Sequence, residues 1–86
     1  MVIKIHFSDE FKRNARKLTR IERKAIIAAL KRFRRNPRHP GLRVQKMRGR
    51  KNIWEARASS DLRILFHVDG NVIFLITCGH HAIEDR

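Results

Sequence analysis

An arginine pair and a glutamate fall on two neighbouring segments that the sequence predicts to be adjacent strands. Side chains alternate between the two faces of a strand, so Glu55 and Arg57 share one face. A tight turn at 59–61 then pairs the following strand in antiparallel register and places Arg57 directly opposite Arg63. Two guanidinium groups facing one another repel, and a bound anion relieves that repulsion. Phosphate is the natural anion, because the planar guanidinium matches its oxygens two at a time.

A second interpretation of the same residues stays open. Glu55 forms a salt bridge with one arginine, and the other arginine is simply solvated. The sequence alone does not separate this arrangement from a phosphate site.

Adjacent histidines, His80 and His81, follow the last predicted strand. Imidazole titrates near neutral pH and therefore can donate or accept a proton in phosphoryl chemistry. A metal site is disfavoured, because no Cys or Glu stands at metal-ligand spacing from the pair, and we predict no cofactor. A surface or helix-capping role for the two histidines is the simpler alternative.

The elements that must position these residues predict a single α+β domain over residues 1–86. A strand at 2–7 precedes two helices, the first capped by Ser8 and the second by Thr19 and ending near Arg35. The period then changes to two, which predicts strands at 42–47, 53–58, 62–68 and 72–78. The order is β-α-α-β-β-β-β, with both helices packed on a mainly antiparallel sheet.

The last predicted strand is apolar on both faces, as is typical of a strand inside its sheet. Two helices cover only one face, so we expect a packed tail or a partner on the other. Cys78 lies in this apolar run, and we expect a buried free thiol.

Positive charge is concentrated in the first part of the chain. The net charge is +13, and residues 1–51 hold 18 Lys and Arg against 3 Asp and Glu. Such a field attracts polyanions, which indicates nucleic acid or an acidic protein as the partner. No apolar stretch reaches the ~18 residues of a membrane helix and no signal-peptide pattern is present, so we expect a cytoplasmic protein without membrane contact.

Five short motifs, in this order and spacing, resemble the RelE/ParE superfamily of bacterial toxins from toxin–antitoxin systems. The resemblance covers essentially the whole chain. The motifs are Asn36-Pro37-Arg38, Lys46-Met47-Arg48-Gly49, Ile53-Trp54-Glu55-Ala56-Arg57, Asp61-Leu62-Arg63-Ile64-Leu65-Phe66 and Gly79-His80-His81.

The resemblance implies a ribosome-dependent endoribonuclease that cleaves mRNA by attack of the message's own 2′-hydroxyl, without a metal. It implies that Arg63 contacts the scissile phosphate, that His81 transfers a proton, and that Glu55 and Arg57 carry catalytic or phosphate-binding groups. It also implies that His80 and four basic residues contact RNA, namely Lys46, Arg48, Arg50 and Lys51. The assignment of acid and base between Glu55 and His81 stays open.

The implied partners are the ribosome, mRNA and an acidic antitoxin that binds partly by charge. Whether the antitoxin complex binds operator DNA is left open. One departure from the family pattern is the tail, which carries no aromatic residue after Phe74. Two rival functions remain, namely a ParE-like inhibitor of DNA gyrase and a non-catalytic basic module that binds nucleic acid.

Overall fold

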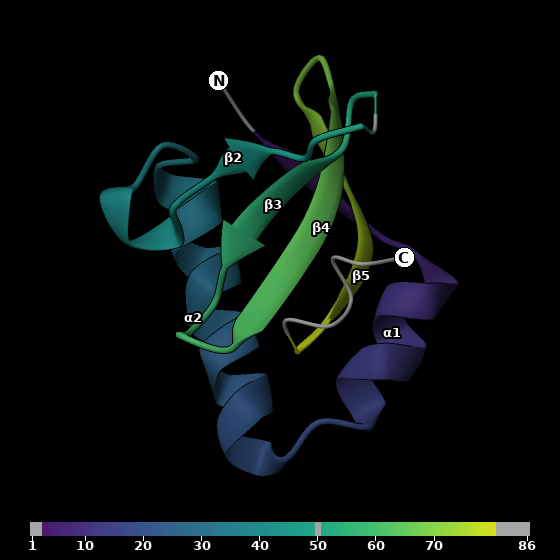
Figure 1. Cartoon of the computed structure of the whole chain (residues 1–86), viewed down its shortest axis with the longest axis vertical. Coiled ribbons are helices and arrows are strands. Elements are labelled where there is room, and N and C mark those ends of the chain that lie inside the picture. The colour runs from purple at the N-terminus through teal and green to yellow at the C-terminus, as the bar shows by residue number, and fades with distance from the viewer. Residues whose placement is uncertain (1–2, 50, 81–86) are drawn as a thin grey trace.

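The computed structural model describes residues 3–49 and 51–80. A five-stranded sheet carries a long helix on one face and a short helix beside the lower end of its last strand (Figure 1). The elements are β1 (Lys4–Phe7), α1 (Asp9–Arg16), α2 (Arg20–Arg35), a 3₁₀ turn (Pro40–Leu42), β2 (Gln45–Lys46), β3 (Trp54–Arg57), β4 (Leu62–Asp69) and β5 (Val72–His80). The α+β class and the order of elements predicted above are confirmed.

Both helices begin where the sequence places their caps. The Ser8 hydroxyl accepts a hydrogen bond from the backbone N–H of Phe11. At the second helix Thr19 and Glu22 each accept from the other's backbone N–H, which is a complete capping box. Unsatisfied N–H groups at the two helix starts are thereby paired.

The strand order is β1-β5-β4-β3-β2, so β4 lies at the centre and β5 is also interior. β1 pairs with β5 in parallel, and the other three pairings are antiparallel. The first and last strands are neighbours in the sheet, although both helices and β2, β3 and β4 lie between them in the chain. The predicted interior position of the last strand is confirmed.

The predicted strand at 42–47 is wrong over its first half. Leu42 lies in the 3₁₀ turn, fully buried, and only Gln45 and Lys46 pair with β3. Arg43 has a left-handed backbone, with φ at 45°, which ends the turn and interrupts any extended run. Alternation of side chains did not distinguish a buried turn residue from a strand residue.

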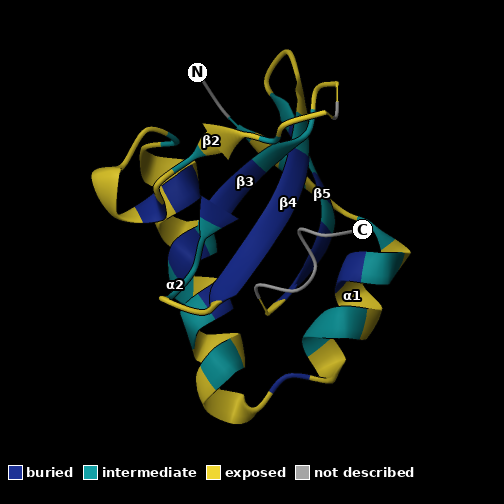
Figure 2. Ribbon diagram, viewed as in Figure 1, coloured by how far each residue is buried: buried dark blue, intermediate teal, exposed yellow. Residues whose placement is uncertain are grey.

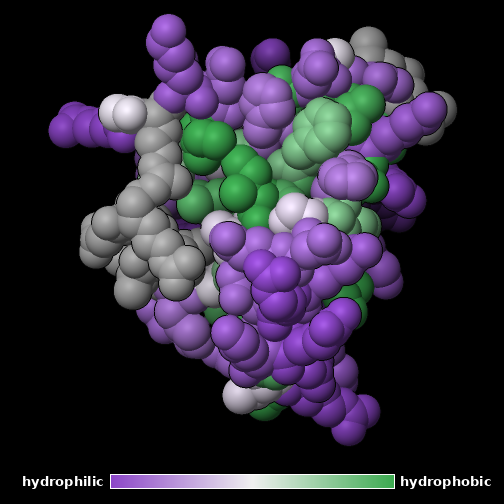
Figure 3. Space-filling view, turned by 90° about the vertical axis from the view of Figure 1, so that its right-hand side faces the viewer, coloured by the Kyte–Doolittle hydropathy of each residue, from purple (hydrophilic) through white to green (hydrophobic). Residues whose placement is uncertain are grey.

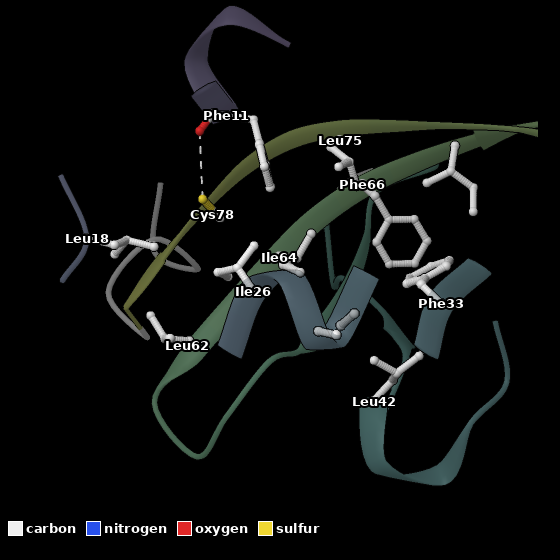
Figure 4. Close-up of a cluster of buried hydrophobic side chains, with 13 residues drawn as sticks. Phe11, Leu18, Ile26, Phe33, Leu42, Leu62, Ile64, Phe66, Leu75 and Cys78 are labelled. Atoms are coloured by element: carbon white, nitrogen blue, oxygen red, sulfur yellow. Dashed lines mark hydrogen bonds between the residues drawn. The ribbon is translucent and has the colours of Figure 1, made fainter. Parts of the chain in front are cut away.

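The core lies between α2 and the sheet (Figure 2). Phe33 of α2 meets Phe66 of β4 edge to face, with ring centroids 4.7 Å apart (Figure 4). At the other end of the core the Cys78 thiol donates to the carbonyl oxygen of Phe11 over 3.8 Å. Burial raises the pKa of this thiol to about 11, so Cys78 is an inert core residue as predicted.

Candidate active site

The sheet face turned away from α2 carries the predicted arginine pair. Arg57 of β3 pairs with Arg63 of β4 in antiparallel register, as the sequence predicts. On the core face, Ala56 pairs with Ile64, and both are fully buried. Strand alternation therefore puts Glu55, Arg57 and Arg63 together on the opposite face.

Arg63 is held in place by the backbone of the turn between β3 and β4. It is only 3% exposed. Its Nη1 lies 3.1–3.3 Å from three carbonyl oxygens, those of Ser59, Ser60 and Leu62. The carbonyl groups of Ser59 and Ser60 belong to the tight turn, whereas that of Leu62 also accepts from the backbone N–H of Ala58. Arg63 is therefore buried, although it lies on the sheet face opposite the hydrophobic core.

Glu55 provides the negative charge for this buried cation. Its carboxylate oxygen Oε1 lies 3.6 Å from Arg63 Nε, and both side chains are less than 10% exposed. The same oxygen accepts a hydrogen bond of 3.2 Å from the side-chain amide of Gln45 on β2. The salt bridge considered above as an alternative is thus present between Glu55 and Arg63.

Arg57 differs from its neighbour across the strand pair. Its side chain is half-buried, and within residues 3–49 and 51–80 no carboxylate forms an ion pair with it. Arg57 can therefore accept a phosphate without losing an existing partner, whereas Arg63 is already committed to the turn and to Glu55. The two arginines face one another in register but have different surroundings.

His80, at the end of β5, bridges two carboxylates from distant parts of the chain. Its Nε2 lies 2.8 Å from Glu22 at the start of α2, and its Nδ1 lies 2.9 Å from Asp61 in the β3–β4 turn. With both carboxylates ionised, the ring donates to both of them only when it is protonated on both nitrogens. The hydrogen bond to Asp61, followed by the Coulombic attraction of Glu22, raises the pKa of His80.

This geometry gives His80 a structural role that the sequence did not predict. Two carboxylates surround the ring, and they repel a phosphate group. We therefore do not include His80 among the RNA contacts proposed below. His81, the predicted proton-transfer residue, lies outside the described residues, as does Arg50.

The other predicted RNA contacts lie at one edge of the sheet and are exposed. Lys46 belongs to β2, and Arg48 and Lys51 belong to the turn that connects β2 with β3. This turn precedes Glu55 and Arg57 directly in the chain. The sequence did not reveal Gln45 as a partner of Glu55, because the register of so short a strand has no sequence signal.

A second feature is an apolar groove between the two helices. The groove has two adjoining parts, with volumes of 340 and 310 Å³. Both parts are lined by Phe7, Ile27 and Leu30, and the larger part is also lined by Phe11, Ala15 and Ile26. Phe7 is 39% exposed and Ile27 is 53% exposed. Basic side chains border the groove, namely Lys12, Arg16, Arg23, Lys31 and Arg34. Figure 3, which views the β1 and α1 side, shows apolar surface surrounded by hydrophilic side chains.

No helix in the described part of the chain combines the length and the apolar composition that crossing a bilayer requires.

No protein-family model and no curated protein sequence matches this chain. Solved structures do match it. A chain of the E. coli DinJ-YafQ toxin–antitoxin complex superposes with a TM-score of 0.79 at 11% identity, over 96% of this chain and 97% of that one. The archaeal RelE-RelB complex from Pyrococcus horikoshii gives a TM-score of 0.73 at 16% identity, over 93% and 96%.

The RelB-RelE antitoxin–toxin complex from Methanococcus jannaschii gives a TM-score of 0.71 at 22% identity, over 93% of this chain and 95% of that one. These matches span nearly the full length of both chains, with the two helices and the sheet in the same arrangement. The chain therefore has the RelE-like fold.

Proposed function

We propose that this protein is the toxin of a toxin–antitoxin pair and acts as a ribosome-dependent mRNA endoribonuclease. The observation that carries the proposal is the arrangement of Arg57, Arg63 and Glu55 on one sheet face. The RelE-like fold and the net charge of +13 support it.

Cleavage by the 2′-hydroxyl of the message needs three kinds of group. A base removes the 2′-hydroxyl proton, an acid protonates the departing 5′-oxygen, and cations stabilise the pentacoordinate phosphorus. Of the two facing arginines, Arg57 is the one with no carboxylate partner in the described part of the chain, and we assign it to the phosphate.

Arg63 positions the site through its buried contacts. Its contacts with the turn carbonyls and with Glu55 fix the end of the β3–β4 hairpin, to which Arg57 also belongs. Its buried positive charge adds to the field at the phosphate. Glu55 and His81 remain our candidates for base and acid, in either order, and no metal takes part in the proposed reaction.

The exposed cations beside the site suit the backbone of a bound RNA strand. Lys46, Arg48 and Lys51 lie on β2 and the turn that leads into β3, and we assign them, with Arg50, to phosphate contacts. Such contacts add affinity that does not depend on sequence and that falls with salt.

We assign the apolar groove between α1 and α2 to the antitoxin. Its apolar floor and basic border fit an amphipathic acidic helix, which places apolar side chains in the groove and carboxylates at the rim. Solved complexes of RelE-like chains with antitoxins support the existence of such a partner.

The test is a reconstituted translation reaction with the purified protein, in which mRNA 5′ ends are mapped by primer extension with and without ribosomes. New ends that appear only with ribosomes, in or near the A-site codon, support the proposal. Intact message together with normal protein output overturns it.

A further inference from the structure

Three aromatic rings form a row across three adjacent strands. His6 of β1 pairs in register with Phe74 of β5, and Phe74 pairs with His67 of β4. The ring centroids of His6 and Phe74 are 5.5 Å apart, and those of His67 and Phe74 are 6.0 Å apart with planes at 28°. The three side chains are therefore in contact, and we call them the aromatic row.

The aromatic row lies on the same sheet face as the arginine site. Ile73 and Leu75, which flank Phe74, are both buried in the core, so the Phe74 ring points to the opposite face. His67 and Arg63 are four residues apart on β4 and share that face. His6 is exposed, and Phe74 and His67 are half-buried, so the rings are partly accessible.

The ring of His67 is oriented without any ligand. Its Nδ1 lies 3.0 Å from the carbonyl oxygen of Asn52, in the turn before β3. A carbonyl oxygen only accepts, so Nδ1 carries the hydrogen and donates it. This bond fixes the plane of the ring relative to Phe74, and the row is pre-organised for stacking.

The charge around the aromatic row favours a nucleic acid as its occupant. Lys4 is two residues from His6 on the same face of β1, and Arg57 and Arg63 lie further along the sheet. Among the described strand residues, the acidic side chains on this face are Glu55, which is paired with Arg63, and Asp69 at the far end of β4. Four residues of strand separate His67 from Arg63, about 13 Å, which corresponds to about four stacked nucleotides.

We propose that His6, Phe74 and His67 are a base-stacking platform for single-stranded RNA bound at the arginine site. Every base has a flat π-face, so aromatic side chains on an accessible sheet bind unpaired RNA through stacking. The inference rests on the proposed RNA substrate and assigns to it a contact that compensates for the absence of an aromatic residue after Phe74.

The test compares two matched substitutions in one assay. Phe74→Leu removes the ring of the platform and keeps an apolar side chain, while Phe7→Leu makes the same change on the opposite face, where Phe7 meets Phe11. Affinity for a fluorescein-labelled single-stranded RNA dodecamer is measured by anisotropy. We expect Phe74→Leu to weaken binding about tenfold or more, and Phe7→Leu to leave it within about twofold. Equal affinities for both variants would overturn the proposal.

Two further measurements test the platform independently of whether Phe74→Leu folds. His6→Ala changes an exposed side chain, so it keeps the fold and should also weaken binding. RNA carrying 4-thiouridine, cross-linked to the wild-type protein, should label the peptides that contain His6 or Phe74. Cross-links confined to other peptides contradict the platform.

Cleavage on ribosomes, measured in parallel, separates this inference from the proposed function. A wild-type protein that cleaves mRNA, with Phe74→Leu equal to it in binding and cleavage, refutes the platform and leaves the function intact. A wild-type protein that does not cleave, while Phe74→Leu loses RNA affinity, refutes the function and supports the platform.

Discussion

Arg63 Nε lies 3.6 Å from a carboxylate oxygen of Glu55, and both side chains are buried on the sheet face turned away from α2. A cation and an anion removed from water together stabilise the fold only while both are present. This pair also joins β3 to β4 at the end of the sheet that carries Arg57. Stability and the proposed chemistry are therefore coupled at this point.

Replacing Arg63 by alanine should destabilise the protein strongly. The substitution leaves the buried Glu55 carboxylate without this cation and removes the donor to three turn carbonyls, and we expect a loss of about 3–5 kcal/mol in the free energy of unfolding. Urea unfolding followed by the fluorescence of Trp54 measures it. Arg57→Ala serves as the control, with an expected change below about 1 kcal/mol. Equal free energies of unfolding for the two variants would show that the Arg63 contacts do not stabilise the fold.

Replacing Arg57 by alanine should instead remove activity. This arginine has no carboxylate partner among the described residues, and loss of one cation at a phosphate site lowers the cleavage rate by about 100-fold. Single-turnover cleavage of mRNA on programmed ribosomes gives the rate. Arg13→Ala, on the exposed surface of α1, is the matched control and should cleave at the wild-type rate. An Arg57→Ala variant as active as this control removes Arg57 from the mechanism.

The bridge from His80 to Glu22 and Asp61 should make stability depend on pH. The pKa of His80 is raised above 6.5, so its stabilising effect is complete below pH 6.5 and is lost as the pH rises through the higher, folded-state pKa. The backbone N–H of Thr19 is the chief cause that lowers the pKa of Glu22 from 4.5. The stability contributed by the ionised Glu22 carboxylate is therefore lost as the pH falls through this lowered pKa.

His80→Gln should therefore lower the Tm more at pH 6 than at pH 9. Thermal unfolding followed by circular dichroism at both pH values measures the difference, with His6→Gln as an exposed control. A His80→Gln variant that lowers the Tm by the same amount at both pH values would mean that the charge of the ring does not stabilise the bridge.

The antitoxin groove should be sensitive to a buried charge at its centre. Ile27→Asp places a carboxylate on the apolar floor of the groove, and we expect the Kd for the antitoxin to rise by about 30-fold or more. Ile21→Asp is the matched control, since Ile21 is 81% exposed on the same helix and does not line the groove. Calorimetric titration with the proposed antitoxin partner gives both values, and equal affinities would place the partner elsewhere.

Much of the site could be predicted from the sequence because it depends on local rules. Strand alternation and a three-residue turn are enough to put Arg57 opposite Arg63, and the capping residues Ser8 and Thr19 mark both helix starts. Local rules do not decide how much solvent reaches a side chain. The burial of Arg63 follows from the turn carbonyls and from Glu55, which have no signal in sequence spacing.

Contacts between segments that are distant in the chain could not be predicted from the sequence either. The parallel pairing of β1 with β5 brings His6 beside Phe74, although 67 residues separate them in the chain. Glu22 and His80 meet for a similar reason. Spacing in the sequence does not link any of these residues to its partner, and only the strand order brings them together.

The chemistry at the 3′ end of the cleaved message tests the central claim most directly. Wild-type protein is added to ribosomes programmed with a defined mRNA, and a parallel reaction omits the ribosomes. The 3′ end of the upstream fragment is then analysed by mass spectrometry. Attack by the 2′-hydroxyl predicts a 2′,3′-cyclic phosphate, or the 3′-phosphate formed from it, at an A-site codon, with the fragment absent when ribosomes are omitted. A 3′-hydroxyl end, or a message that stays intact, would contradict the proposed mechanism.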